Sequence, residues 1–231
     1  MMQRWGSDAI RFMKDASEYG SYYEELSKEL LPYIPCDGHI CDAGCGLGYL
    51  ANELAKYSKQ VTALDVSDAA INALKARKTR QNLLARCEDI FKLTERFDAM
   101  IFCYFGKTSE ILSLAKKLCK GNAIVIKRDC AEHLFSIGEV KRKKHSVERI
   151  ADVLQEWKIP FEQKQLRMEM GQPFRTFDDA IRFFELYNKS DQPIEANAVQ
   201  QRLVNTDDPS FPLYLPSLRK MEMIVFSAKD L

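Results

Sequence analysis

The stretch that decides the fold is His39-Ile40-Cys41-Asp42-Ala43-Gly44-Cys45-Gly46-Leu47-Gly48-Tyr49-Leu50. It begins with a short apolar run typical of a buried strand, passes through a glycine-rich turn, and ends in the start of a helix. Glycine lets the backbone approach a ligand closely. The N–H groups at the start of the helix favour a negatively charged group. We therefore expect a ligand site at this strand-to-helix turn.

Asp42 narrows the chemistry of that ligand. Its carboxylate would repel a phosphate and attract an ammonium group, which indicates a ligand with a nucleoside, a positive amine and a carboxylate. S-adenosylmethionine fits this description. The competing NAD fingerprint Gly-x-Gly-x-x-Gly places its third glycine on Tyr49 when it is read from Gly44. Read from Gly46, it places the third glycine on Ala51, which is sometimes accepted, but it leaves Asp42 and Gly44 unexplained.

Composition indicates one globular domain over residues 1–231, with 46% hydrophobic residues. The 34 basic and 33 acidic residues nearly cancel, which disfavours a general nucleic-acid binder. No apolar run approaches the length of a membrane span, and the first residues lack the apolar core of a signal peptide. The seven cysteines contain no Cys-x-x-Cys pair. They are typical of buried thiols in a reducing compartment, so we expect a cytoplasmic protein without a metal.

Periodicity predicts an α/β fold. A helical pattern over residues 7–34 ends at Pro32 and Pro35. Short apolar strands then alternate with amphipathic helices, which predicts a parallel sheet with helices on both faces. The expected strands are 40–43, 60–64, 83–87, 99–104 and 123–126, and the expected helices are 50–57, 69–76 and 111–118.

The C-terminal third has a different pattern. We expect a helix over 147–157, a strand over 163–170, and a helix from Thr176 to Tyr187. A polar segment with a short helix near 196–203 precedes a last strand over 221–228. The two strands could otherwise pair as a hairpin, so residues 171–220 are interpreted as an inserted cap or lid, with a purely structural flap as the alternative.

Acidic residues follow the second and third expected strands, where open α/β sheets bind ligands. Asp65 lies 21 residues beyond Gly44, a spacing at which an acid meets a ribose diol, although it could instead cap a helix or be a turn residue. Asp89 can accept from an adenine amino group, with the N–H of Ile90 donating to the ring, although it could be a solvated surface acid. Cys103 ends the fourth strand, where the sulfonium is expected. The ordered series favours the ligand site.

These motifs resemble those of the class I S-adenosylmethionine-dependent methyltransferases. The similar segments are Asp-Ala-Gly-Cys-Gly-Leu-Gly, Leu-Asp-Val-Ser, Cys-Glu-Asp-Ile and Phe-Asp-Ala-Met-Ile. The resemblance covers residues 36–128, taken as the cofactor-binding core, and extends weakly to the last strand. It implies a Rossmann-like three-layer sandwich whose seven-stranded, mostly parallel sheet has its last strand antiparallel between the fifth and sixth. N-terminal helices and a helical insertion before the last strand complete the expected fold.

The resemblance also implies roles for individual residues. Gly44 and Gly46 would line the methionine moiety, and Asp42 would hold its amino group. Glu88 precedes Asp89 where many relatives have Gly-Asp, so either acid could meet the adenine, and we favour Asp89. The expected cofactor-binding residues are Asp42, Ala43, Gly44, Gly46, Asp65, Val66, Asp89, Ile90 and Cys103.

Methyl transfer mainly requires alignment, and a general base is needed only where the acceptor must lose a proton. The catalytic residue is therefore unknown from sequence. Tyr104 could orient the acceptor or form an aromatic wall, and His133 is the best candidate for a general base. Tyr22, Tyr23 and Phe105 are candidates for the substrate side, with packing as the alternative role of the two tyrosines.

We expect a small-molecule acceptor with an O, N or C nucleophile, and S-adenosylhomocysteine as the second product. An RNA or protein acceptor, reached through the basic run Lys141–Lys144, is the first alternative. A non-catalytic S-adenosylmethionine-binding protein is the second. Residues 103–106 read Cys-Tyr-Phe-Gly, unlike the Asn/Asp-Pro-Pro-Tyr of DNA-amine methyltransferases. We expect a monomer or homodimer.

Overall fold

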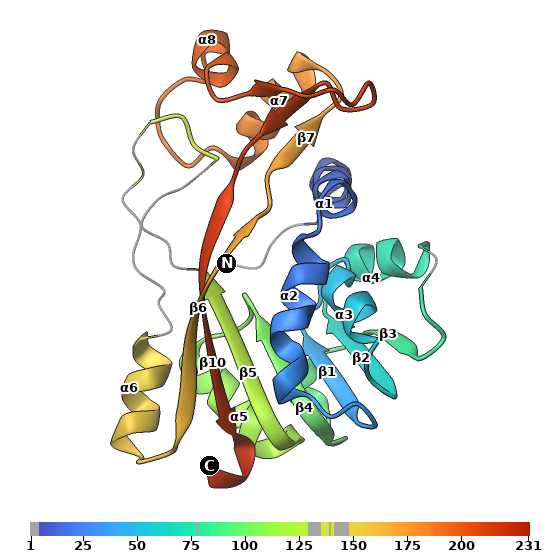
Figure 1. Cartoon of the computed structure of the whole chain (residues 1–231), viewed down its shortest axis with the longest axis vertical. Helices are drawn as coiled ribbons and strands as arrows, with labels where there is room; N and C mark the ends of the chain where they lie inside the picture. Colours follow the sequence, from blue (N-terminus) through green and yellow to red (C-terminus); the bar gives the residue numbers. More distant parts are fainter. Residues whose placement is uncertain (1–4, 78, 129–134, 139, 141–147) are drawn as a thin grey trace.

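The computed structural model describes residues 5–77, 79–128, 135–138, 140 and 148–231, and its main sheet has seven strands (Figure 1). The strands are β1 (His39–Ala43), β2 (Gln60–Asp65), β3 (Leu83–Cys87), β4 (Phe97–Cys103), β5 (Cys119–Arg128), β6 (Phe161–Glu169) and β10 (Leu218–Ser227). Their order is β3-β2-β1-β4-β5-β10-β6. The first five pair in parallel, and β10 runs antiparallel to both β5 and β6. This confirms the predicted fold class and the position of the last strand.

Helices cover both faces of the sheet, as the alternating pattern predicted. One face packs against α2 (Tyr22–Leu30), α3 (Tyr49–Leu54) and α4 (Asp68–Lys75), and the other against α5 (Thr108–Leu118) and α6 (Glu148–Glu156). Successive residues of β1 alternate between the two layers, with Ile40 in one core and Cys41 in the other. Because both faces are covered, the central strands are continuous apolar runs.

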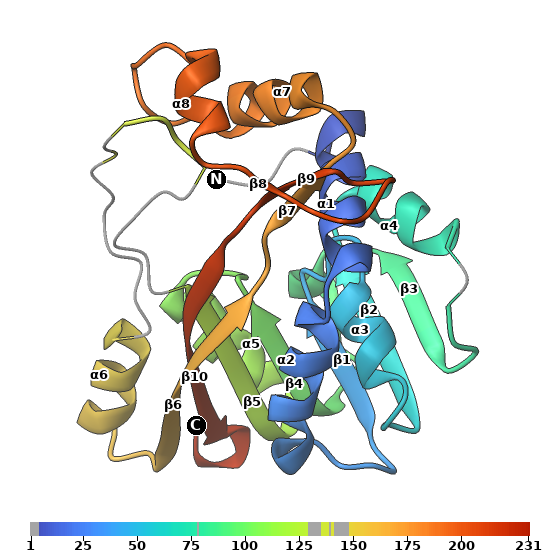
Figure 2. The same ribbon diagram turned by 45° about the horizontal axis from the view of Figure 1, so that its top comes forward.

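The N-terminal helical pattern is broken at Gly20. The sequence predicted N-terminal helices within a helical pattern over residues 7–34 without placing a boundary between them, and the structure has α1 (Ser7–Tyr19) and a separate α2. Gly20 is extended, with φ −115° and ψ 178°. Glycine is a poor helix former, so a change of direction costs little here. The break frees α1 to pack away from the main sheet (Figure 2).

The segment between β6 and β10 is an insertion with a small sheet of its own. The two long strands pair from Phe161 opposite Phe226 to Glu169 opposite Leu218. Residues 170–217 leave the main sheet between those ends and carry α7 (Phe177–Tyr187) and α8 (Ala196–Gln200). They also form a sheet of β7 (Gln172–Phe174), β9 (Leu213–Leu215) and β8 (Val204–Asn205). The prediction of a helical insertion is therefore incomplete, because strands of two or three residues leave no periodic signal.

The helix α1 packs on the insertion. Phe12 is fully buried and meets Phe183 of α7 edge to face, with ring centroids 5.1 Å apart. Two ion pairs flank this contact, Arg11 with Asp179 at 2.9 Å and Arg175 with Asp15. The insertion and α1 thus share a third hydrophobic cluster beside the carboxyl edge of the main sheet (Figure 2). Within the described ranges, no helix combines the length and the apolar character needed to cross a bilayer.

Candidate active site

The glycine turn after β1 has three left-handed residues. Gly44, Gly46 and Gly48 have φ values of 71°, 54° and 68°, which residues with a side chain rarely adopt. The N–H of Cys45 donates to the carbonyl of Leu64 at 2.8 Å, which ties the turn to the end of β2. The following helix α3 begins at Tyr49. The strand, turn and helix expected from the sequence are therefore present.

Asp42 is a buried carboxyl group with an unsatisfied oxygen. Only 2% of the residue is exposed, and Oδ2 has no hydrogen-bond donor among the described residues. Burial, and then repulsion from Asp65, raises its pKa to about 7, against a smaller lowering by the backbone N–H of Ala51. A buried carboxylate that lacks a partner is costly, and an ammonium group would supply one. The residue fits the amino group of S-adenosylmethionine.

Asp65 joins the ends of β2 and the glycine turn. Its Oδ2 accepts from the N–H of Gly46 at 2.9 Å, and its Oδ1 accepts from the N–H of Ser67 at 2.8 Å. Each carboxylate oxygen keeps a further lone pair for a hydroxyl. The cap of α4 is Ser67, whose Oγ accepts from the N–H of Ala70 at 3.3 Å. Asp65 is therefore not the cap of α4, while its contact with the N–H of Ser67, two residues on, agrees with the alternative of a turn residue.

The acids after β3 have different partners. Glu88 is ion-paired with Arg86, whose guanidinium also reaches Glu95 at 2.7 Å. Asp89 instead accepts from the N–H of Phe91 at 3.1 Å and begins the short 3-10 helix over Ile90–Lys92. The N–H of Glu88 donates to the carbonyl of Asp65 at 3.0 Å, so this segment lies beside the end of β2. These contacts favour Asp89 over Glu88 for an adenine amino group.

Two tyrosines and a methionine meet beyond the end of β4. The hydroxyls of Tyr22 and Tyr104 lie 3.0 Å apart, and Met221 Sδ accepts from them at 3.0 and 2.7 Å respectively. Burial raises the pKa of both hydroxyls, so both are uncharged at neutral pH. Tyr104 has a φ of 56°, a strained value for a residue with a side chain. Tyr23 stacks on Tyr49, with centroids 5.7 Å apart, as its packing alternative predicted.

Two aromatic rings cover the glycine turn. A Cβ on Gly44 would lie 2.4 Å from Cδ2 of Phe105, and a Cβ on Gly46 would lie 2.9 Å from Cζ2 of Trp5. Lys127 donates to the carbonyl of Phe105, and also to that of Gly106 at 2.7 Å. Burial lowers the pKa of Lys127 to about 8. Trp5 was not predicted, because a single tryptophan near an end of the sequence carries no local signal of what it covers.

The remaining predicted residues lie at the ends of β1, β2 and β4 or outside the described residues. Ala43 is fully buried at the end of β1, while Val66 is half exposed beyond β2. Burial, followed by the charge of Asp42, raises the pKa of Cys103 at the end of β4. His133 and Lys141–Lys144 lie outside the described residues. In the part of the chain that the structure describes, no group of three or more potential metal ligands gathers.

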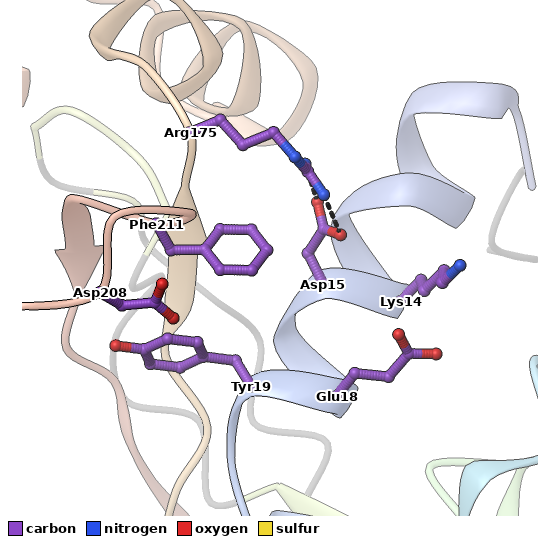
Figure 3. Close-up of a pocket in the computed structure, with 7 residues that line it drawn as sticks. All are labelled: Lys14, Asp15, Glu18, Tyr19, Arg175, Asp208 and Phe211. Carbon is purple, nitrogen blue, oxygen red and sulfur yellow. Dashed lines mark hydrogen bonds and ion pairs between the residues drawn. The ribbon is translucent and has the colours of Figure 1, made fainter.

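A separate cleft of about 460 Å³ lies between α1 and the insertion (Figure 3). Figure 3 shows the ion pair of Arg175 and Asp15 facing it, with the rings of Tyr19 and Phe211 nearby. Its lining residues are Lys14, Asp15, Glu18, Tyr19, Arg175, Asp208 and Phe211. None of the predicted cofactor residues lines this cleft, so it is distinct from the turn after β1.

Comparisons with known proteins identify the family of the chain. A model of the methyltransferase domain family matches residues 36–178. A ubiquinone biosynthesis O-methyltransferase of Coxiella burnetii is 40% identical over 65 residues, which is 26% of this chain. That match spans 28% of the length of the Coxiella protein, and four further strains give the same result.

Solved structures of low sequence identity share the fold. A candidate methyltransferase from Bacillus halodurans C-125 is 15% identical with a TM-score of 0.55, covering 90% of this chain and 99% of its own. Magnesium protoporphyrin IX methyltransferase from Synechocystis PCC 6803, solved with bound SAH, is 13% identical with a TM-score of 0.50, covering 97% and 89%. Because the family model covers more than half of the sequence, the chain belongs to the methyltransferase domain family, as its resemblance to the class I S-adenosylmethionine-dependent enzymes implied.

Proposed function

We propose that this methyltransferase transfers the methyl group of S-adenosylmethionine to a small-molecule O, N or C nucleophile, with S-adenosylhomocysteine as the second product. The observation that carries the proposal is the buried, unsatisfied Oδ2 of Asp42 beside a turn of three left-handed glycines. A carboxylate at this position would repel a phosphate group, whereas an ammonium group would neutralise its charge. The partial match to an O-methyltransferase of a small molecule supports the acceptor class.

Each part of the donor has a matching group at the carboxyl edge of the sheet. Asp42 would pair with the amino group, and Asp65 would accept from the ribose hydroxyls. Asp89 and the N–H of Ile90 would contact the adenine. Val66 would lie beside the adenine, and Cys103 would lie beside the sulfonium. The backbone of Ala43, Gly44 and Gly46 would face the methionine moiety.

The protein's task in the reaction is alignment. When bound, S-adenosylmethionine would supply an electrophilic methyl carbon for in-line attack by a lone pair of the acceptor, with S-adenosylhomocysteine as the leaving group. Tyr22 and Tyr104 keep their protons at neutral pH, so they would hold the acceptor by hydrogen bonds and not act as bases. His133 stays a candidate for the base when the acceptor must lose a proton.

The insertion, expected over residues 171–220 and observed over 170–217, would complete the site as a cap. It packs beside the carboxyl edge of the sheet together with α1, where it would exclude water from the acceptor.

We also propose that the protein is cytoplasmic. The support for this proposal is that all six cysteines in the described part of the chain are free thiols.

Calorimetric titration with S-adenosylmethionine and S-adenosylhomocysteine tests the donor site. We expect both to bind the wild type, and Asp65→Ala to weaken binding by about 1–3 kcal/mol, because the ribose donors lose their acceptor. Asp37→Asn, an exposed acid of the loop before β1, is the matched control and should bind as the wild type does. Unchanged affinity in Asp65→Ala would show that the pocket lies elsewhere, and NAD and free nucleotides would then be titrated.

A labelled methyl group identifies the acceptor class. The protein is incubated with methyl-labelled S-adenosylmethionine and a cell extract divided into small molecules, RNA and protein. We expect label in the small-molecule fraction and stoichiometric S-adenosylhomocysteine. Label on RNA or protein would overturn the acceptor class while leaving the enzyme, and absence of turnover with every fraction would favour a binding protein.

A further inference from the structure

Arg219 lies on the acceptor side of the proposed site. It belongs to β10, which continues past the carboxyl ends of the parallel strands toward the insertion (Figures 1 and 2). Met221 pairs with Arg128, the last residue of β5, so Arg219 is two residues beyond that end. Residues 219 and 221 share one face of the strand and lie about 7 Å apart along it. The cluster of Tyr22, Tyr104 and Met221 is therefore two residues along β10 from Arg219, on the same face of the strand.

Arg219 is a buried cation without an anionic partner in the described ranges. Only 8% of it is exposed, and its Nε donates to the carbonyl of Met170 at 3.4 Å. No carboxylate of the described residues forms an ion pair with it, and its two terminal nitrogens have no acceptor there. Its guanidinium carbon lies 5.8 Å from the ring centroid of Tyr22 and 6.0 Å from that of Phe135. A buried charged side chain normally has a partner of opposite charge, as the buried Asp15 has Arg175.

The titratable groups that the structure describes around Arg219 do not supply the missing charge. It acts electrostatically on four tyrosines and one thiol, Tyr22, Tyr23, Tyr104, Tyr187 and Cys103. Burial raises the pKa of each of these groups, so all are neutral at pH 7. Arg128 adds a second cation, 5.5 Å from the ring centroid of Tyr104. The local charge on this side of Tyr104 is therefore positive.

Asp42 is the acidic group that acts on the same thiol as Arg219. Its charge raises the pKa of Cys103, while that of Arg219 lowers it. The two charged groups thus act on Cys103 with opposite sign. Asp42 is the proposed partner of the donor's ammonium group, so it is not available to neutralise Arg219. Among the described residues, no other anion balances Arg219, which leaves that place to an anionic group of the other substrate.

We infer that Arg219 binds a carboxylate of the methyl acceptor, and that the acceptors are small carboxylic acids whose nucleophilic atom lies toward Tyr104. This inference rests on the proposed function. The planar guanidinium matches a carboxylate with two parallel hydrogen bonds, and its two terminal nitrogens have no acceptor among the described residues. The rings of Tyr22 and Phe135 would enclose the apolar part of the acid. The spacing of about 7 Å along the strand suits an acceptor about the size of one aromatic ring.

The test uses the whole chain with three pairs of matched probes. Benzoate, phenylacetate and hexanoate are each titrated against the corresponding amide, after the protein has been saturated with S-adenosylhomocysteine. We expect at least one acid to bind about tenfold more tightly than its amide, because the charged hydrogen bonds exist only for the acid. Arg219→Gln should abolish the preference, and Arg219→Lys should retain part of it.

Arg167→Gln is the matched control. Arg167 is an exposed arginine of the neighbouring strand β6, opposite Lys220, and its loss should leave the preference unchanged. The inference is overturned if no acid is preferred to its amide, or if the preference survives Arg219→Gln. The first titration, with S-adenosylhomocysteine alone, separates the two proposals. If it fails, the proposed function fails, and if it succeeds while no acid is preferred, only the role of Arg219 fails.

A stability measurement separates ligand binding from a structural role. Removal of an unpaired buried cation should raise the Tm of the free protein, so Arg219→Met is expected to melt above the wild type. Addition of the preferred acid should raise the Tm of the wild type and leave that of Arg219→Met unchanged. A large fall in the Tm of Arg219→Met would indicate that Arg219 holds the fold, which would contradict the inference.

Discussion

In the proposed donor site, the clearest cost to stability from a single residue is that of Asp42. Its pKa is about 7 against a usual value of 3.8, chiefly because it is buried. Between these two values the folded chain holds a proton that the unfolded chain has released. The free energy of unfolding of the free protein therefore falls as the pH rises from about 4 to 7, by at most about 4 kcal/mol.

Asp42→Asn removes this titration. We expect the variant to show a flatter dependence of stability on pH between 4 and 7, and a higher Tm than the wild type at pH 8. Binding of S-adenosylhomocysteine should weaken, because the amide offers no charge to the ammonium group. Thermal unfolding between pH 4 and pH 8 checks the first two results, with Asp37→Asn as the control. A slope equal to that of the wild type would show that Asp42 is already ionised in the free protein.

Binding should also displace the proton of Asp42. At pH 6 the free carboxyl group is largely protonated, whereas a carboxylate paired with an ammonium group is ionised. Binding of S-adenosylhomocysteine at pH 6 is therefore expected to release up to about one proton. Calorimetry in two buffers of different ionisation enthalpy measures this release. The release should disappear in Asp42→Asn and diminish in the wild type at pH 8.

Gly44 should tolerate no side chain. Its φ of 71° disfavours a Cβ by about 1–2 kcal/mol. A Cβ there would also meet Cδ2 of Phe105 at 2.4 Å. Gly44→Ala should therefore lower the Tm and reduce binding of S-adenosylhomocysteine. Gly20→Ala is the control, since Gly20 has a φ of −115° and no atom within 4 Å of an added Cβ. Equal effects of the two changes would contradict this account of the turn.

Secondary-structure elements show where reasoning from the sequence succeeds. The strand 83–87 is observed with the predicted bounds, and the turn after β1 was predicted because its glycines and Asp42 are local signals. The last strand was expected from residue 221, yet β10 begins at Leu218. Exposed and buried residues alternate over the first three positions of β10, which therefore form no apolar run. Pairing with β6 extends the strand over these positions. Arg219 was missed for that reason.

The ion pair between α1 and the insertion is an element-scale test. Arg175→Met leaves the buried carboxylate of Asp15 without its guanidinium, which should cost about 1–3 kcal/mol of stability. The double variant Arg175→Met with Asp15→Asn should recover most of that loss, because no unpaired charge remains. Thermal unfolding measures both. Lys28→Met breaks the exposed pair with Glu24 and should change little. An additive double variant would mean that the two side chains do not interact.

At the scale of the whole molecule, three hydrophobic clusters divide the described residues. Two lie on the two faces of the seven-stranded sheet, and the third joins the insertion to Phe12 of α1. The third cluster is the smallest of the three. Regions with fewer buried apolar contacts open at lower free energy than the rest of a protein. The insertion should therefore open before the main sheet does.

Native-state hydrogen exchange measures this order. Amides of α7 and α8 should exchange through an opening of lower free energy than amides of β1, β4 and β5, which lie in the middle of the sheet. The long strand β10 should exchange with the main sheet along 221–227, where it pairs with β5. Equal protection of insertion and sheet would indicate one cooperative unit and would contradict the division.

The register of β6 and β10 has an evolutionary consequence. Their ladder closes at Glu169 and Leu218, so the two ends of the insertion leave the sheet as neighbours. Descendants of this gene can therefore lengthen, shorten or exchange the insertion while the glycine turn and the strand ends around it keep their positions. Recruitment to a new metabolite would then proceed by rewriting one loop, with the methyl-donor half inherited intact.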